Sequence, residues 1–357
     1  MNSLCRKAAE ILPFAIIGLA IASTSAAAQP GNNDAATPAA VSQFQAMPRG
    51  AVPPADLEAR VSKEKALAQA TGFLMRANGI APGPRPACRP EMAQFDWRSF
   101  GKVTAPARKQ KCGDCWAFAA VAAYESSYLI ENQETVSTTN LHASEQQALD
   151  CADARYDCGG GWHDAVLNYF KSPGEVPDKA YAYTATKGQC KTVSARPYIA
   201  DSSGPVDGAN IPSDALLKTA ICEHGPIVAA VDSKDWDRRL PNGDYVYSRK
   251  NPNWLADYPN GVFAGRLSKP NLTMANFVSG DIDHEVLIVG WDDTLRAWII
   301  KNSWGPDWGD GGYMKLSYGH NNLGFNASWV QARSVRNQFS AKLLNQLESL
   351  KYAFENQ

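Results

Sequence analysis

The pattern of hydrophobic and polar residues changes from helical to strand-like near the middle of the chain. Residues 55–78 carry apolar side chains at helical spacing among charges, and residues 115–133 form a mostly apolar stretch typical of a buried helix. Short β-type runs separated by turns follow at 226–231, 285–289 and 298–300. A helical first half and a strand-rich second half predict an α+β fold of two subdomains, with a cleft between them as the default binding site.

The start of the chain has a different pattern. The basic residues Arg6 and Lys7 precede an apolar run at 11–22 and a tract of small residues that ends at Ala28. This order is typical of a secretory signal that is cleaved after Ala28. A membrane anchor is the alternative, but the run is shorter than the roughly 20 residues that span a bilayer, and no later stretch is apolar enough. We expect a signal peptide over 1–28 and a secreted or periplasmic protein without a membrane span.

The segment that follows the signal is mixed in character. Residues 29–54 are rich in Ala, Pro, Asn and Gln and have few large apolar side chains, which predicts a disordered lead-in. A Pro-rich run at 81–86 ends the helical pattern of 55–78. That helix fits either a propeptide or the surface of the main domain. We assign residues 29–90 to a pro-segment with a Pro-rich linker.

Composition excludes some partners and draws attention to the thiols. The 357 residues include 35 basic and 36 acidic side chains, so net charge gives no reason to expect nucleic acid as a partner. Of the eight cysteines, Cys5 would leave with the signal. Cysteines of exported proteins generally pair, so the odd one among the remaining seven is a candidate reactive thiol.

Three side chains supply the parts of a cysteine nucleophile with its base. Cys115 opens the predicted buried helix, where the dipole and free N–H groups favour a thiolate. His284 stands just before one strand-like run, and Asn302 follows another. A thiol, an imidazole and a carboxamide that fixes the tautomer form such a catalytic set.

Together with their neighbours, these residues resemble the papain family of cysteine peptidases. The resemblance covers about residues 95–330 and implies a papain-like fold and endopeptidase activity on proteins or peptides, with no cofactor and no metal. The clusters that carry it are Asp96–Trp97–Arg98, Lys111–Cys112–Gly113–Asp114–Cys115–Trp116, Ser144–Glu145–Gln146, Asp150–Cys151, Cys158–Gly159–Gly160–Gly161–Trp162, Asp283–His284 and Lys301–Asn302–Ser303–Trp304–Gly305.

The resemblance implies a role for each residue of the site. Cys115 attacks the peptide carbonyl, His284 transfers protons and Asn302 orients the imidazole. The second donor to the oxyanion is a glutamine six residues before the nucleophile in the family, but here Lys109 holds that position and Gln110 comes five before. Gln110 is therefore the expected donor. The positions expected to contact substrate are Gly160, Gly161, Trp162, Ala230, Glu285 and Trp304.

Other departures from the family concern charge and length. Asp114 replaces a small residue before the nucleophile, and we expect its carboxylate to point to solvent rather than inward. Glu285 follows the histidine and would either favour a basic residue two positions upstream of the cut or turn to solvent. The separation of Cys115 and His284 is 169 residues, more than the roughly 130–150 expected. The excess at 237–280 predicts an inserted loop on the strand-rich subdomain.

The cysteines offer both a disulfide pattern and rival interpretations. With Cys115 free, six thiols allow 15 pairings. The family pattern suggests Cys112–Cys158 and Cys151–Cys190, which leaves Cys88–Cys222. Alternatively, the Cys-x-x-Cys motif is a redox pair or half of a zinc site, although no preceding strand supports the former and export disfavours the latter. An inactive, peptide-binding family member is a further alternative.

The end of the chain predicts one more helix. Leu343, Leu347, Leu350 and Phe354 recur at helical spacing, so residues 336–357 form an amphipathic helix after a peptidase domain at 91–335. We prefer packing against the enzyme body to docking on a partner or membrane. We expect a monomer. The family's propeptide signature is not visible in residues 29–90, so inhibition by a short, atypical pro-segment is a hypothesis.

Overall fold

The computed structural model describes residues 46–82, 85–106, 108–193, 197–335 and 339–355. All of them belong to one unit, which runs from Phe44 to Gln357. The expected signal peptide and residues 29–45 of the pro-segment lie outside the described residues. Within the described ranges, no helix has the length and apolar character needed to cross a membrane.

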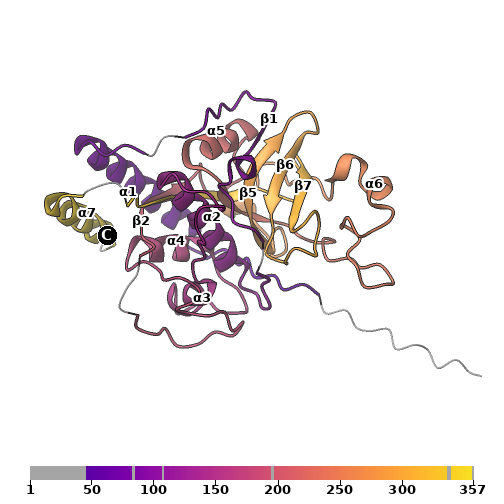
Figure 1. The fold of residues 1–357 in the computed structure, drawn as a ribbon, viewed down its shortest axis with the longest axis horizontal. Helices are drawn as coiled ribbons and strands as arrows, with labels where there is room; N and C mark the ends of the chain where they lie inside the picture. The colour runs from indigo at the N-terminus through magenta and orange to yellow at the C-terminus, as the bar shows by residue number, and fades with distance from the viewer. Residues whose placement is uncertain (1–45, 83–84, 107, 194–196, 336–338, 356–357) are drawn as a thin grey trace, which may run out of the picture. The chain divides into compact units, whose positions relative to one another are not determined.

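Helices dominate the first half of this unit and strands the second, which confirms the predicted α+β class (Figure 1). The helices are α1 Leu57–Ala77, η1 Trp97–Phe100, α2 Cys115–Glu131, α3 Glu145–Cys151, α4 His163–Lys171, α5 Asp214–His224, α6 Trp254–Asp257, η2 Pro259–Gly261, η3 Met274–Asn276 and α7 Ala341–Glu355. The strands are β1 Gln94–Asp96, β2 Ala200–Pro205, β3 Ile227–Val231, β4 Val262–Phe263, β5 His284–Asp292, β6 Ala297–Lys301, β7 Tyr313–Ser317 and β8 Phe325–Ala332.

The strands form one sheet in the order β2-β8-β3-β5-β6-β7-β4, and β1 pairs with β5 off this path. Neighbours are antiparallel except β4 and β7, which are parallel. Every residue of β3 and β5 is buried, which explains their uninterrupted apolar runs. In β7, buried and partly exposed residues alternate, as in a strand with one face toward solvent. The sheet therefore places β5, with His284 at its start, near the centre of the domain.

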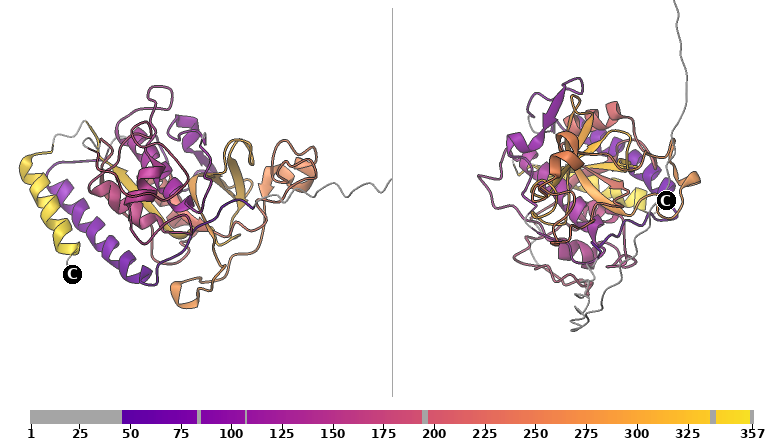
Figure 2. Two further views of the ribbon diagram at one scale, coloured as in Figure 1. Left: turned by 90° about the horizontal axis from the view of Figure 1, so that it is seen from below. Right: turned by 90° about the vertical axis from the view of Figure 1, so that its right-hand side faces the viewer.

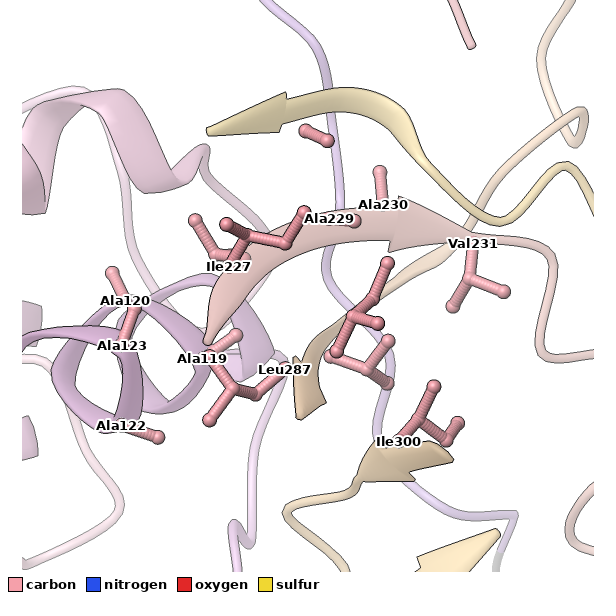
Figure 3. Close-up of a cluster of buried hydrophobic side chains, with 14 of the residues drawn as sticks. Ala119, Ala120, Ala122, Ala123, Ile227, Ala229, Ala230, Val231, Leu287 and Ile300 are labelled. Carbon is pink, nitrogen blue, oxygen red and sulfur yellow. The ribbon is translucent and has the colours of Figure 1, made fainter. Parts of the chain in front are cut away.

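Helix α2 forms the core of the helical half. All of its side chains except Tyr128 are buried, because small and apolar residues cover every side of the helix. It packs against α3 and α4 and against β5 and β8 of the sheet. Figure 3 shows alanines of α2 near Ile227 of β3 and Leu287 of β5, all buried. Small side chains let the helix approach the sheet closely, and each buried Ile or Leu contributes about 1.5–3 kcal/mol.

Serine caps start two of the shorter helices. The Ser144 hydroxyl accepts a hydrogen bond from the Gln147 backbone N–H at 2.9 Å, and α3 begins directly after it. Ser213 caps α5 in the same way. Such caps satisfy N–H groups that have no partner within the helix, so they fix where each helix begins.

The first and last helices of the described residues, α1 and α7, lie side by side (Figure 2). Leu57 and Val61 of α1 are buried, and this helix also packs on β2. Leu343 of α7 is buried, and the Lys351 ammonium donates a hydrogen bond to the Lys171 carbonyl at 3.0 Å. The C-terminal helix therefore packs on the rest of the chain mainly through α1.

The predicted insertion at 237–280 does extend the strand-rich half, but it is more than a loop. It contains α6, η2, η3 and β4, and β4 adds to the edge of the sheet beside β7. Tyr247 packs against Trp254, Tyr258 and Phe263 at ring-centroid distances of 4.5, 4.8 and 5.7 Å. This aromatic cluster gives the insertion a small core of its own.

Three disulfides join Cys112 to Cys158, Cys151 to Cys190 and Cys88 to Cys222. They consume the thiols that a zinc site with Cys151 and Cys158 would need. They also leave no Cys112–Cys115 redox pair. Among the described residues, Cys115 is the one free cysteine. The bond to Cys222 ties the segment before β1 to α5, 134 residues further along the chain.

Candidate active site

Cys115 is the first residue of α2, and its thiol is fully buried. Burial raises the pKa of this thiol well above its ordinary value, and the charge of Glu285 raises it further. Hydrogen bonds with backbone groups of Glu285 and Gly50 act in the opposite direction. The start of a helix predicts a favoured thiolate, but here burial outweighs that effect. In this arrangement Cys115 is therefore a neutral thiol.

His284 and Asn302 meet because β5 and β6 are neighbours in the sheet. The imidazole Nε2 lies 2.8 Å from Asn302 Oδ1. The Ser303 backbone N–H donates to the same atom at 2.8 Å, which identifies it as the oxygen. His284 Nε2 must then carry the hydrogen, and Nδ1 is the basic nitrogen. Within the described part of the chain, this Nδ1 is buried without a hydrogen-bond partner.

Aromatic rings enclose the imidazole. The ring of Trp304 lies 5.0 Å from that of His284, and the ring of Trp236 lies 6.3 Å away. Burial lowers the pKa of His284 to about 3, although the hydrogen bond to Asn302 raises it. The thiol contacts the backbone of Glu285, the residue that directly follows His284. The imidazole and the thiol are therefore both neutral, because burial shifts the pKa of each group against formation of a thiolate–imidazolium pair.

Gln110 reaches the same site despite its position five residues before Cys115. Its side chain is fully buried, and Oε1 accepts a hydrogen bond from the Ser303 hydroxyl. The Gln110 backbone N–H also donates to the Ser303 carbonyl at 2.9 Å. The side-chain Nε2 donates to the carbonyl oxygens of Pro48 and Cys112, each at 3.0 Å. The carboxamide is thus anchored beside Asn302 with its N–H groups directed at carbonyls.

The glycines before α4 pair with a stretch from the beginning of the chain. Gly161 donates its N–H to the Gly50 carbonyl at 2.9 Å and accepts from the Val52 N–H at 3.1 Å. A Cβ at Gly161 would lie 2.6 Å from the Trp116 ring, and Gly160 has a φ of +145°, so both positions require glycine. We call residues 46–55 the covering segment. It occupies the backbone groups at which the sequence predicts substrate pairing.

Further hydrogen bonds hold the covering segment across the site. The backbone N–H groups of Gly50 and Ala51 both donate to the Asp283 carbonyl at 3.1 Å, next to His284. Ala51 is only 6% exposed. Composition predicts a disordered lead-in for this stretch, and that prediction is wrong for residues 46–54. The segment gives no periodic signal, because its contacts are made by backbone groups and by the separate side chains of Met47 and Arg49.

Glu285 neither points to solvent nor stands alone. Its Oε2 lies 3.0 Å from His163 Nδ1, and His163 Nε2 lies 3.0 Å from the Ser328 hydroxyl. All three side chains are buried. Two further predicted site residues lie beside them: Ala230 pairs with Glu285 between β3 and β5, and the Trp162 ring lies next to His163. Burial would lower the pKa of His163, but the charge and hydrogen bond of Glu285 outweigh it and raise that pKa. A preference for a basic substrate residue at Glu285 stays a prediction.

Asp114 contradicts the expectation of a solvent-facing carboxylate. It is fully buried, and Oδ2 accepts a hydrogen bond from the Tyr183 hydroxyl at 2.7 Å. Burial raises the pKa of Asp114 to about 7, although the Tyr183 hydrogen bond lowers it. No pattern in the sequence points to Tyr183 as the partner, because it lies in a loop 69 residues further along the chain. The carboxyl group points inward, where its charge disfavours the Cys115 thiolate.

Comparisons with known proteins point to one family. The model of the papain family of cysteine proteases matches residues 92–333. The chain is similar to digestive cysteine proteinase 3 of Homarus americanus, 31% identical over 65% of this chain and 64% of that protein. It is also similar to a cysteine protease of Blomia tropicalis, 32% identical over 65% and 63%. The alignments thus span somewhat less than two thirds of these relatives.

Solved structures agree with the sequence relatives. The structure of digestive procathepsin L2 from Tenebrio molitor larval midgut matches with a TM-score of 0.51 and 25% identity, over 80% of this chain and 78% of that one. A structure from work on antibody cross-reactivity between the mite allergens Blo t 1 and Der p 1 matches with a TM-score of 0.52 and 27% identity, over 75% and 81%. The fold of the described residues is therefore the papain-like one.

Proposed function

The chain belongs to the papain family of cysteine proteases, and we propose that it is an exported endopeptidase in which Cys115 is the nucleophile and His284 its acid–base partner. It is a hydrolase of the cysteine-type peptidase class. The observation that carries the residue assignment is the hydrogen bond from His284 Nε2 to Asn302 Oδ1. It leaves Nδ1 as a base beside the backbone that contacts the thiol. Asn302 and Trp304 act by holding and covering the imidazole.

The reaction follows from these groups. His284 Nδ1 takes the proton of the Cys115 thiol, and the thiolate sulfur attacks the substrate carbonyl carbon. The resulting tetrahedral oxyanion collapses as His284 returns the proton to the leaving amine, and a thioester to Cys115 remains. A water molecule, deprotonated by His284, then attacks the thioester and releases the acid and the thiol.

Two hydrogen-bond donors serve the oxyanion in this proposal. One is the Cys115 backbone N–H at the start of α2, and the other is Gln110 Nε2. The Pro48 carbonyl oxygen, which accepts from Nε2 at 3.0 Å, stands in for a substrate carbonyl oxygen. This contact supports Gln110 as the donor in spite of its shifted position in the sequence.

We assign the covering segment to an inhibitory pro-segment. It satisfies Gly161, Gln110 and the Asp283 carbonyl, the groups that a substrate backbone would use. The burial to which it contributes also keeps the thiol and the imidazole neutral. A relative of similar fold from Tenebrio molitor is named as a procathepsin, which supports a precursor form here.

The direction of the covering segment explains why it is not itself cut. In a substrate, the acyl side pairs with Gly161 and the leaving amine lies beside His284, so the chain runs from Gly161 past His284. In the covering segment, the N–H of Met47 donates to Asp237 Oδ2 at 3.1 Å, and Gly50 and Val52, further along the chain, pair with Gly161. It therefore runs opposite to a substrate. Hydrolysis requires the carbonyl carbon of a peptide bond at the Cys115 thiol and the nitrogen of the same bond at His284. The reversed segment does not place the atoms of its peptide bonds in this order.

Export and the domain boundaries complete the proposal. Three disulfides fit an oxidising compartment outside the cytoplasm, as does the digestive role named for the Homarus relative. The proposed parts are a signal at 1–28, a pro-segment at 29–90, a peptidase domain at 91–335 and a terminal helix at 336–357. Because Cys88 is bonded to Cys222, any piece that contains Cys88 stays attached after maturation.

The test is proteolysis by the exported chain, residues 29–357, with and without the covering segment in place. Gly50→Ala displaces the segment, since the added Cβ would lie 1.9 Å from the Gly113 carbonyl oxygen. A diverse peptide mixture is incubated with each protein under reducing conditions, and mass spectrometry identifies the cut bonds. Internal cuts by the Gly50→Ala chain, absent when Cys115→Ala is added, support the proposal. Failure of the Gly50→Ala chain to cut any peptide would refute it.

A further inference from the structure

The side chain of Arg49 fills an acidic pocket beside the catalytic residues. Its guanidinium lies 2.9 Å from Asp237 Oδ1 and 3.3 Å from Asp283 Oδ2. It also donates to the Ser233 hydroxyl at 2.8 Å and to the Ser233 carbonyl at 3.3 Å. The guanidinium carbon lies 5.8 Å from the centre of the Trp304 ring. Two carboxylates, a hydroxyl, a carbonyl and an aromatic face thus surround one positive charge.

The pocket lies on the leaving side of the proposed reaction. Asp283 directly precedes His284, and Trp304 packs on the imidazole ring that protonates the leaving amine. Ser233 and Asp237 follow β3, on the side toward which the chain of a substrate continues after the cut bond. The first residue of the leaving fragment is therefore the one whose side chain reaches this pocket.

Among the described residues, the ion pairs of Asp237 and Asp283 are formed with Arg49. The Lys234 ammonium lies 3.3 Å from Asp232, on the other side of Ser233. Arg239 stacks on Tyr245 at 3.5 Å and donates to a loop carbonyl. When the covering segment leaves, Asp237 and Asp283 lose the guanidinium that they now hold. Two carboxylates that are only 17% and 22% exposed are then left to attract another cation.

We propose that Ser233, Asp237 and Asp283 form a subsite that selects arginine or lysine immediately after the cut bond. This inference rests on the proposed peptidase function and names its substrate class. Arginine suits the pocket better than lysine, because its planar fork can reach Asp237 and Ser233 at once and stack on Trp304. Asp237 is the decisive residue, since it contributes the shortest ion pair of the pocket.

The experiment uses the exported chain carrying Gly50→Ala and four peptides that differ only in the residue after one cut bond, which is Arg, Lys, Gln or Glu. The readout is the ratio of kcat/KM for the Arg peptide to that for the Gln peptide, with the cut bond verified by mass spectrometry. We expect a ratio of about ten, from a charge-assisted hydrogen bond in a partly exposed pocket. Adding Asp237→Asn lowers the ratio to about two or three.

A matched control lies two residues away. Asp235 is exposed, so Asp235→Asn makes the same charge change outside the pocket, and the ratio stays at its original value. Equal cleavage of the Arg and Gln peptides would overturn the subsite while leaving the peptidase function intact. The same ratio in the Asp237→Asn and Asp235→Asn proteins would also overturn it. Cleavage of none of the four peptides, together with none in the diverse mixture, refutes the peptidase function and this inference with it.

Discussion

A single methyl group at residue 50 tests whether the covering segment closes the site. Gly50 passes so close to the body that a Cβ would lie 1.9 Å from the Gly113 carbonyl oxygen, whereas ordinary contacts of a Cβ exceed 3.0 Å. The backbone of Gly113 cannot shift easily to make room. Its N–H donates to the Cys158 carbonyl at 2.9 Å, and Cys158 is joined by a disulfide to Cys112. The covering segment must therefore move by more than 1 Å in the Gly50→Ala chain.

The size of the effect follows from the hydrogen bonds of the segment. Two of them involve Gly50 itself, with Asp283 and Gly161, and a third from Ala51 shares the Asp283 carbonyl. Each is worth about 1 kcal/mol, so losing all three costs about 3 kcal/mol of closed-state stability. The ratio of open to closed molecules then rises by about two orders of magnitude.

Alkylation of Cys115 measures this ratio without any substrate. The exported chain, residues 29–357, is treated with iodoacetamide without reductant. The mass of the whole protein then gives the modified fraction, since its other six cysteines are paired. We expect the rate to rise about a hundredfold in the Gly50→Ala chain. Gly72→Ala is the control, because its Cβ meets only the flexible end of Arg76 at 3.3 Å and the change favours helix α1. Equally slow alkylation of the Gly50→Ala and wild-type chains would refute the closed-site account.

Other residues give further tests. In the Gly50→Ala background, we expect Gln110→Ala to lower kcat by about 10²–10³-fold with little change in KM. An unchanged kcat would show that Gln110 does not donate a hydrogen bond to the oxyanion. The pKa of Asp114, about 7 in the fold, lies above its ordinary value, so this carboxyl costs stability as pH rises from about 4 to 7. Asp114→Asn removes that cost. Urea denaturation should show that its gain in unfolding free energy is about 2.5 kcal/mol larger at pH 8 than at pH 5, and a gain that does not depend on pH would contradict a raised pKa for Asp114. His163→Ala leaves the Glu285 carboxylate buried without its partner and destabilises the fold by about 3 kcal/mol, and adding Glu285→Gln restores part of the loss. Additive losses in this double mutant would show that the pair is not coupled.

The sequence predicts the fold well where one periodicity dominates. The stretch at 115–133 is apolar on all sides, and α2 begins at Cys115 and is buried as expected. The runs at 285–289 and 298–300 became β5 and β6, since continuous apolar residues suit strands covered on both faces. The insertion was harder to anticipate. Its core is a cluster of aromatic rings separated by turns, and such a cluster has no regular period.

At the site, the sequence predicts which residue types are present but not what encloses them. The order of motifs brings together His284 and Asn302, because they flank neighbouring strands. The inward turn of Asp114 depends on Tyr183 in a distant loop, and the partner of Glu285 is His163, 122 residues away. Contacts of this kind are fixed by tertiary packing, and no local pattern in the chain encodes them.

In the proposed precursor, the attachments of the covering segment to the rest of the chain determine which cut can release it. The segment continues into α1, which packs on β2, and beyond α1 the chain is bonded through Cys88 to Cys222. A cut between α1 and Cys88 leaves the segment joined to a helix that still packs on the body, so the local concentration of the inhibitor stays high. A cut between Val52 and α1 leaves it held by a few hydrogen bonds and the Arg49 contacts alone, and it can dissociate. Val52 is 53% exposed, so this stretch is open to a protease. In this proposal the Cys88–Cys222 disulfide has a role separate from inhibition, because it fastens the chain just before β1 to α5 after the covering segment has gone.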